Sequence, residues 1–268
     1  MDEAGVQSAD EEYIVEVDGV GLETHFYHST QGVTAPTMVF LHEGLGSVAM
    51  WREFPGRIVS ATGLPAVVYS RCGYGKSDPR VKAYDANFMH REALNVLPGL
   101  LKSLQVIEPI LIGHSDGGTI ALIYASEHPV TGVVVEAPHI FVEDICVKAI
   151  ARLWRAREDM NLVAKLGRYH NDPEAVFEGW KDIWLDPAFR DWNIFDQVMG
   201  ITCPILAIQG ELDEYGSMAQ IEGIASNALG SVTLSKLSRC GHSPHRDKTE
   251  LVIQEIARFI KWIRGRYA

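Results

Sequence analysis

Residues 109–118, Pro109-Ile110-Leu111-Ile112-Gly113-His114-Ser115-Asp116-Gly117-Gly118, decide how the chain is interpreted. The run begins as a short apolar strand, passes through a tight glycine-containing turn with a serine at its apex, and enters a helix. This is the G-x-S-x-G pattern of a nucleophile elbow, in which a sharp strand-to-helix turn exposes the serine hydroxyl above the edge of a sheet. Glycine on both sides avoids the collisions that bulkier residues would meet in such a turn. The pattern predicts Ser115 as a nucleophile if suitable partners occur elsewhere in the chain.

Short apolar runs separated by helical patterns extend on both sides of the elbow, from residue 37 onward. This rhythm predicts an α/β fold with a mostly parallel sheet covered by helices on both faces. The expected strands are residues 38–42, 66–70, 110–113, 132–136, 205–210 and 232–237. The expected helices are residues 50–61, 88–104, 118–127, 218–229 and 250–264. Residues 13–18 and 22–28 are expected to form a hairpin at one edge of the sheet.

Residues 141–200 interrupt this rhythm, because they show helical patterns only and hold four of the six tryptophans. The simplest interpretation is a helical cap over the carboxyl edge of the sheet, where open α/β sheets bind ligands. We therefore expect a flexible acidic tail at residues 1–12, a core formed by residues 13–140 and 201–268, and a cap insertion at 141–200. Most aromatic residues of the cap should pack it against the core, while Trp154 and Trp184 are candidates for lining a pocket.

A serine hydroxyl requires a base within hydrogen-bond reach and a carboxylate that orients this base. Elbows of this type take their partners in the chain order serine, acid, histidine. The acid is expected in the loop after the strand at 205–210. Asp213 is the best candidate there, with Glu211 and Glu214 as the alternatives.

The base is expected after the last strand, in the loop that begins at residue 238. His242 follows a glycine in this loop and is the expected base, whereas His245 is expected to shape the loop. His114, directly before the nucleophile, is expected to be structural. No spacing typical of a metal site is present, so neither loop histidine is expected to bind zinc.

Two backbone amides are needed where negative charge develops on the substrate oxygen. The residue after the nucleophile, Asp116, is expected to supply one. The second is expected from the glycine-bearing loop at residues 42–47, His42-Glu43-Gly44-Leu45-Gly46-Ser47, where the Gly44 amide is the best candidate.

With these elements the chain resembles the α/β-hydrolase fold family over residues 13–268. The motifs that carry the resemblance lie at residues 41–47, 113–118, 210–213 and 241–245, and the loop at 70–77 resembles the family's D-x-R-G-x-G-x-S pattern. In that loop Ser70 replaces the acid and Cys72 replaces the arginine, and Glu43 stands where the family's H-G-x motif has glycine. The resemblance implies the fold and nucleophile–acid–histidine chemistry on diverse substrates. Serine at the apex disfavours the branches that use an aspartate nucleophile.

The side chain of Asp116 has two interpretations. An acidic residue in the first turn of a helix is stabilised by the helix dipole, by about 0.3–1 kcal/mol. Alternatively, the carboxylate binds a cationic substrate group, such as an α-amine, together with Glu43 or Glu136. Glu136 and His139 lie at the exit of the strand at 132–136, where they either line the cleft or brace this exit.

Composition excludes several other classes of function. A net charge of −11 disfavours nucleic acid and anionic membranes as partners. The four cysteines form no C-x-x-C pair, so neither a disulfide framework nor a zinc site is expected. No cofactor is expected for the proposed chemistry. With no secretory signal and no apolar run near the roughly 20 residues of a membrane span, a cytoplasmic location is expected. The sequence leaves open whether the protein forms a homo-oligomer.

These inferences favour a serine hydrolase that cleaves small-molecule carboxylic esters or lactones through an acyl-enzyme. The same three side chains also suit hydrolysis of a carbon–carbon bond or of a small amide, including α-amino esters and amides. An alternative of another class is a ligand-binding receptor on the same fold.

Overall fold

A mixed sheet of eight strands forms the centre of the molecule, in the order β1-β2-β4-β3-β5-β6-β7-β8. β2 runs antiparallel to both β1 and β4, and all pairs from β4 to β8 are parallel. The strands are β1 (Glu11–Val17), β2 (Val20–Tyr27), β3 (Met38–Leu41), β4 (Ala66–Tyr69), β5 (Ile110–His114), β6 (Gly132–Glu136), β7 (Ile205–Gly210) and β8 (Val232–Leu237). The structure, a computed structural model, describes residues 11–29, 31–32 and 36–267.

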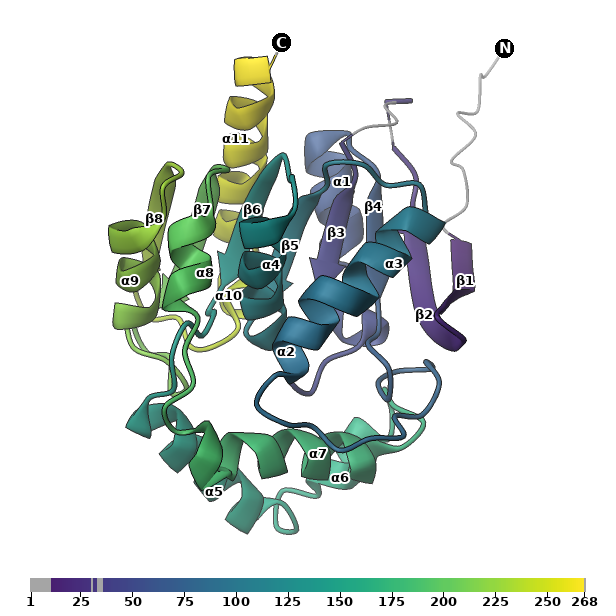
Figure 1. Cartoon of the computed structure of the whole chain (residues 1–268), viewed down its shortest axis with the longest axis vertical. Coiled ribbons are helices and arrows are strands. Elements are labelled where there is room, and N and C mark those ends of the chain that lie inside the picture. Colours follow the sequence, from purple (N-terminus) through teal and green to yellow (C-terminus); the bar gives the residue numbers. More distant parts are fainter. Residues whose placement is uncertain (1–10, 30, 33–35, 268) are drawn as a thin grey trace.

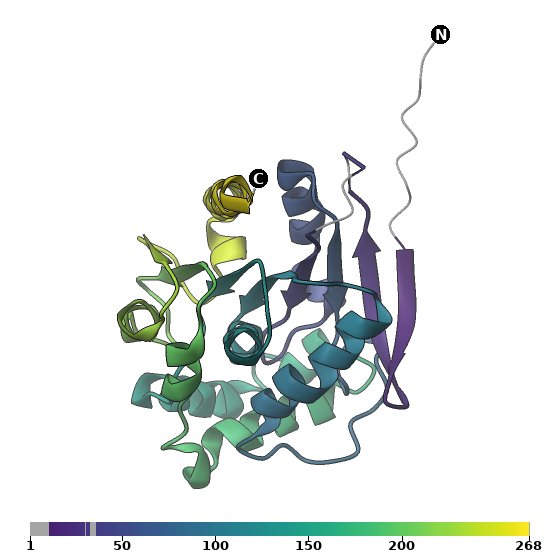
Figure 2. The same ribbon diagram turned by 45° about the horizontal axis from the view of Figure 1, so that its top comes forward.

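Helices cover both faces of this sheet (Figure 2). One face carries α1 (Phe54–Thr62) and α11 (Thr249–Tyr267); the other carries α3 (Leu97–Ser103), α4 (Asp116–Glu127) and α9 (Ala219–Asn227). The shorter helical turns are η1 (Val48–Trp51), α2 (Phe88–Arg91), η2 (Glu92–Val96) and α10 (Pro244–Asp247).

Alternating residues of each central strand divide the apolar core into two clusters. In β3, Val39 and Leu41 pack on the side of α4, while Met38 and Phe40 pack on the side of α1 and α11. This follows from the two-residue period of a strand, whose successive side chains point to opposite faces. Because both faces are buried, the strands read as continuous apolar runs, as the sequence predicts.

A helical insertion, residues 141–200, joins β6 to β7. It comprises α5 (Asp144–Ala156), α6 (Leu162–Leu166), α7 (Pro173–Leu185), η3 (Pro187–Phe189) and α8 (Phe195–Gly200). Figure 1 shows α5, α6 and α7 as a layer beyond one end of the sheet, in green at the bottom of the view. α8 returns to the body and packs against α4 and α9.

The predicted α/β fold is confirmed, and three predicted strands, β6, β7 and β8, have the expected ends. The helix expected at 50–61 is divided, because Arg52 adopts a positive φ of 53° between η1 and α1. The helix expected at 88–104 contains the π-type turn η2 just before Pro98. A proline lacks an N–H and its ring clashes with the carbonyl four residues earlier, which accounts for the widened turn.

Most of the acidic tail expected at residues 1–12 lies outside the described residues. Its last two residues were assigned wrongly, since Glu11 and Glu12 belong to β1, where they pair with Phe26 and His25. The antiparallel pairing with β2 extends the strand to this point. In the part of the chain that the structure describes, no helix is both long and apolar enough to cross a membrane.

Candidate active site

Ser115 occupies a strained turn between β5 and α4. Its φ of 52° and ψ of −119° lie outside the regions that residues with a Cβ ordinarily adopt. A Cβ on Gly117 would lie 2.0 Å from the carbonyl oxygen of Leu41, and one on Gly113 would lie 2.3 Å from that of Gly117. The glycines are therefore required by the close approach of the backbone on both sides of the serine.

The structure brings Ser115, His242 and Asp213 together from three loops at the carboxyl edge of the sheet. His242 Nε2 lies 2.9 Å from Ser115 Oγ, and His242 Nδ1 lies 2.9 and 2.8 Å from the two oxygens of Asp213. Since an ionised carboxylate only accepts, Nδ1 carries the ring proton and Nε2 is left to accept the serine proton. These contacts have the geometry that a serine nucleophile, its base and an orienting acid require.

Hydrogen bonds to Asp213 keep its carboxylate ionised. It accepts from Gln209 Nε2 at 2.7 Å and from the amides of Tyr215 and Gly216 at 2.8 and 3.3 Å. Burial raises the pKa of Asp213, but the hydrogen bond and charge of His242 and the Tyr215 amide outweigh it and hold the pKa below its usual value. For His242, burial acts in the opposite direction and lowers the pKa. The hydrogen bond and the charge of Asp213 outweigh this effect, so the pKa of His242 lies above its usual value.

The loop after β3 brings Gly44 to the pocket that Ser115 also lines. Within the described residues the Gly44 amide has no hydrogen-bond partner. The amide of Asp116 is the first of α4, so the helix itself offers it no acceptor. Both residues whose amides are expected to face a developing negative charge therefore line the pocket of Ser115.

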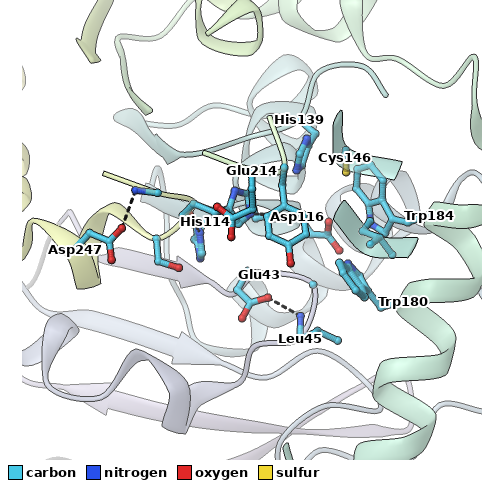
Figure 3. A pocket seen from close by; sticks show the side chains of 17 residues that line it. Glu43, Leu45, His114, Asp116, His139, Cys146, Trp180, Trp184, Glu214 and Asp247 are labelled. Atoms are coloured by element: carbon cyan, nitrogen blue, oxygen red, sulfur yellow. Dashed lines mark hydrogen bonds between the residues drawn. The ribbon is translucent and has the colours of Figure 1, made fainter. Parts of the chain in front are cut away.

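A pocket of about 290 Å³ opens above the serine between the core and the insertion (Figure 3). The core supplies the loops of Ser115 and His242, and the insertion supplies Trp180, Trp184, Cys146 and Ile150. Four of the six residues expected around a pocket are among those lining it, namely Glu43, Asp116, His139 and Trp184. Its lining includes the carboxylates of Glu43, Asp116, Glu214 and Asp247, and no lysine or arginine among the described residues.

Asp116 is the most deeply buried of these carboxylates, with 1% of its surface exposed. Within the described part of the chain neither of its oxygens has a hydrogen-bond partner, and the nearest cation is Arg71, whose Nη2 lies 3.8 Å from Oδ2. Burial raises the pKa of Asp116 to about 6; Glu43 adds to this rise, while Arg71, the indole of Trp184 and His242 oppose it. Burial also lowers the pKa of His139 to about 3, so this pocket histidine is neutral.

Two residues expected at the pocket lie elsewhere. Glu136 is fully buried behind the site, where its Oε2 accepts from the amide and Nδ1 of His245 at 2.9 and 3.0 Å. Trp154 lies on α5, is 38% exposed and lines a separate depression on the insertion. Glu136 therefore braces the loop of His242, in keeping with the alternative that the sequence left open, and neither residue lines the pocket.

The remaining predicted residues have clear places. His114 is buried and donates from Nε2 to the carbonyl oxygen of His242 at 2.6 Å, which makes it a structural link between the two loops. Glu211 is exposed and outside the pocket. Within the described residues, no group of three or more His, Cys, Asp or Glu side chains could hold a metal ion, and all four cysteines are free.

Several residues at the site were not predicted. Trp180 precedes Trp184 by four residues on α7, a spacing that places both on one face of the helix and could have identified it. Gln209 is a polar residue in the apolar run of β7, which is a detectable signal for a buried hydrogen-bonding role. Tyr215, whose ring centroid lies 4.8 Å from that of His242, carries no such signal.

Comparison with known proteins agrees with this geometry. The model of the alpha/beta hydrolase family matches residues 38–255. The chain belongs to this family. It is 30% identical to human serine hydrolase BPHL (Homo sapiens) over 62% of the chain and 59% of that protein, so the match leaves a large part of the human enzyme uncovered. It is 24% identical to the uncharacterized hydrolase YugF of Bacillus subtilis, over 91% of the chain and 96% of that protein.

Solved structures of other alpha/beta hydrolases share the fold at lower identity. The proline iminopeptidase of Mycobacterium smegmatis superposes with a TM-score of 0.72 at 16% identity, covering 96% of this chain and all of that one. The enol-lactonase of Burkholderia xenovorans gives a TM-score of 0.70 at 18% identity, covering 93% of this chain and all of that one. Sequence identities this low support a common fold but do not indicate which substrate the chain binds.

Proposed function

We propose that this alpha/beta hydrolase is a serine hydrolase that cleaves small-molecule carboxylic esters or lactones. The observation that carries the proposal is the hydrogen bond of 2.9 Å between His242 Nε2 and Ser115 Oγ, with Asp213 fixing the ring from the other side. A serine hydroxyl is a weak nucleophile at neutral pH, and such an adjacent base activates it.

In the proposed reaction, Ser115 Oγ attacks the substrate carbonyl carbon while His242 takes the hydroxyl proton. The amides of Gly44 and Asp116 stabilise the oxyanion of the tetrahedral intermediate. When the bond to the alcohol oxygen breaks, His242 returns the proton to the leaving group, and an acyl-serine remains. Water, deprotonated by His242, then attacks the acyl carbon and releases the acid and Ser115.

The insertion serves as the cap in this proposal. Two of its four tryptophans, Trp180 and Trp184, line one side of the pocket (Figure 3). A volume of about 290 Å³ is close to the range of pockets that bind small molecules.

A panel of chromogenic esters of increasing acyl length, assayed with the wild type and with Ser115→Ala, tests the proposal. We expect turnover with the wild type and its loss in Ser115→Ala, with acyl-Ser115 detected by mass spectrometry after rapid quenching. Turnover that survives the substitution contradicts the assignment of Ser115. Binding of esters without turnover in the wild type supports the receptor alternative.

The acidic pocket favours a second candidate, the hydrolysis of α-amino esters or amides. Asp116 offers a buried carboxylate without a hydrogen bond, and Glu43, Glu214 and Asp247 add negative charge around it. A substrate ammonium group would be attracted by this charge. Matched esters with and without the α-amine test this: the amine should raise kcat/KM, and Asp116→Asn should remove at least about tenfold of that advantage. If the ratio of kcat/KM between the amino ester and the matched ester is the same in the wild type and in Asp116→Asn, Asp116 has a structural role.

Hydrolysis of a carbon–carbon bond is less well supported. The chain is 25% identical to the 2-hydroxy-6-oxononadienedioate hydrolase of Paraburkholderia xenovorans, over 85% of the chain and 87% of that enzyme. A dioate substrate carries two negative charges, which the four carboxylates of this pocket would repel. We expect no turnover of such a diacid, and rapid turnover would revive this alternative.

A further inference from the structure

The peptide group between Glu43 and Gly44 is held from one side by three donors. The carbonyl oxygen of Glu43 accepts from His42 Nδ1 at 2.7 Å, from the Gly46 amide at 3.0 Å and from Arg71 Nη2 at 3.1 Å. A trans peptide is planar, with its N–H and C=O pointing in opposite directions. Fixing the Glu43 carbonyl inside the protein therefore aims the Gly44 N–H away from these donors, and Gly44 lines the pocket.

Arg71 is the charged member of this set, and it is 4% exposed. Its guanidinium also lies 3.8 Å from Asp116 Oδ2 and over the ring of Tyr74, with 4.8 Å to the ring centroid. Asp116 supplies the second amide of the proposed oxyanion hole. One buried cation thus lies next to both residues that frame the proposed hole, at the Glu43 carbonyl before the Gly44 amide and at the side chain of Asp116.

The geometry distinguishes this arrangement from simple neutralisation of Asp116. An arginine paired with a carboxylate frequently forms a fork of two short hydrogen bonds to it. Here the hydrogen bond goes to the Glu43 carbonyl, while within the described chain the Asp116 oxygens and the Nε and Nη1 atoms of Arg71 have no hydrogen-bond partner. The guanidinium is therefore aimed at the peptide that carries the Gly44 amide.

We propose that Arg71 is a positioning residue for the reaction at Ser115, which orients and polarises the Glu43–Gly44 peptide behind the oxyanion. This inference rests on the proposed serine hydrolase function. A charged donor on the carbonyl strengthens the N–H of the same peptide as a donor, because hydrogen bonds in series polarise one another. A cation in a poorly solvated site also acts more strongly on the oxyanion than it would in water. Since the oxyanion forms only as the transition state is approached, the effect should fall on kcat and leave KM nearly unchanged.

The test compares Arg71→Met, which removes the charge, with Arg71→Lys, which keeps it. Arg80→Met is the matched control, because Arg80 also stacks on a tyrosine and donates to a backbone carbonyl, but that carbonyl belongs to Ala175 and not to the Glu43–Gly44 peptide. Acylation by 4-nitrophenyl acetate is followed by stopped flow, and binding of a boronic acid, which forms a tetrahedral adduct with a serine, gives a second readout.

Removal of an oxyanion donor lowers kcat by about 10²–10³-fold. Removal of a residue that acts through one such donor should lower the acylation rate by a smaller factor, about 10–100-fold. We expect this loss in the acylation rate of Arg71→Met, a KM within about twofold of the wild type, weaker boronate binding, and partial recovery in Arg71→Lys. Arg80→Met should acylate at the wild-type rate. If Arg71→Met does not fold, as judged by its thermal transition, Arg71→Gln replaces it, since Gln keeps a donor but no charge.

Each outcome decides between the two proposals. Acylation of Arg71→Met at the wild-type rate, or a rise in KM alone, overturns the role of Arg71. A wild type that forms no acyl-Ser115 with any ester overturns the proposed function itself, whatever the variants do.

Discussion

The imidazole of His170, in the insertion, donates a hydrogen bond of 2.9 Å to the carbonyl oxygen of Leu45, the residue after Gly44. Its other nitrogen, Nδ1, accepts from the amide of Gly75 at 2.9 Å. Since an amide can only donate, the ring is neutral with its proton on Nε2. The next residue, Asn171, donates its amide to the Gly75 carbonyl at 3.0 Å. One buried ring thus ties the insertion to two loops of the core, including the loop of the proposed oxyanion hole.

Replacing this ring with phenylalanine should destabilise the protein at neutral pH. His170→Phe loses two buried hydrogen bonds and leaves the Gly75 amide and Leu45 carbonyl without partners, which costs about 1–3 kcal/mol. Burial lowers the pKa of His170, although the Leu45 carbonyl and the charges of Glu43 and Glu23 oppose it. The unfolded chain therefore binds the proton more readily than the folded one, and the stabilisation is lost as the pH falls below about 6.5.

Thermal unfolding at pH 8 and pH 5 measures this effect. The difference in unfolding midpoint temperature between the wild type and His170→Phe should be smaller at pH 5 than at pH 8. His128→Phe is the control, because that ring contacts only Tyr124 among the aromatic contacts of the described residues. If this difference in midpoint temperature is the same at both pH values, the neutral form of His170 is not the form that stabilises the protein.

Gly44 and Trp180 leave no room for a side chain between them. A Cβ on Gly44 would lie 2.1 Å from Trp180 Nε1, so Gly44→Ala must displace either the loop or the indole. Misplacing one oxyanion donor should lower kcat/KM by about 10²-fold or more. The double variant Gly44→Ala/Trp180→Leu should recover part of this loss, because the space is restored. Ester assays on the four proteins of the cycle provide the measurement, and full activity in Gly44→Ala contradicts the assignment of this amide.

Asp213→Asn tests the choice among three acidic residues of one loop. The amide cannot hold the His242 tautomer as a carboxylate does, so kcat should fall by about 10⁴-fold. Because Asp213 raises the pKa of His242, the acid limb of the remaining activity should shift to lower pH. Glu211 is an exposed neighbour of Asp213 in the same loop, so Glu211→Gln should have the same pH–rate profile as the wild type. A large loss in Glu211→Gln with an active Asp213→Asn would reverse the assignment.

The sequence was sufficient for the fold and for the choice of three side chains that the structure brings together, Ser115, Asp213 and His242, because both depend on local signals. Buried strands read as apolar runs, and Asp213 and His242 follow the ends of such runs. The supporting contacts depend on tertiary structure. Leu45, Gly75 and His170 lie far apart in the chain, and no periodicity records that one ring joins them. Glu136 illustrates the same limit, because its position at a strand end suits a pocket as well as a brace, and only packing decides between them.

The burial of Asp116 predicts a trade of stability for function at this position. Its pKa of about 6 in the folded protein exceeds the usual 3.8, so the folded state binds the proton more tightly than the unfolded chain. The contribution of Asp116 to the stability of the protein is therefore most favourable below about pH 4, and it becomes less favourable as the pH rises through about 6. Asp116→Asn should be more stable than the wild type at pH 8, by about 1–3 kcal/mol, and the difference should disappear towards pH 4. Urea unfolding across this range measures it, with Glu214→Gln as an exposed carboxylate control from the same pocket. If Asp116→Asn is instead the less stable protein at pH 8, the attraction to Arg71 outweighs the burial of the charge.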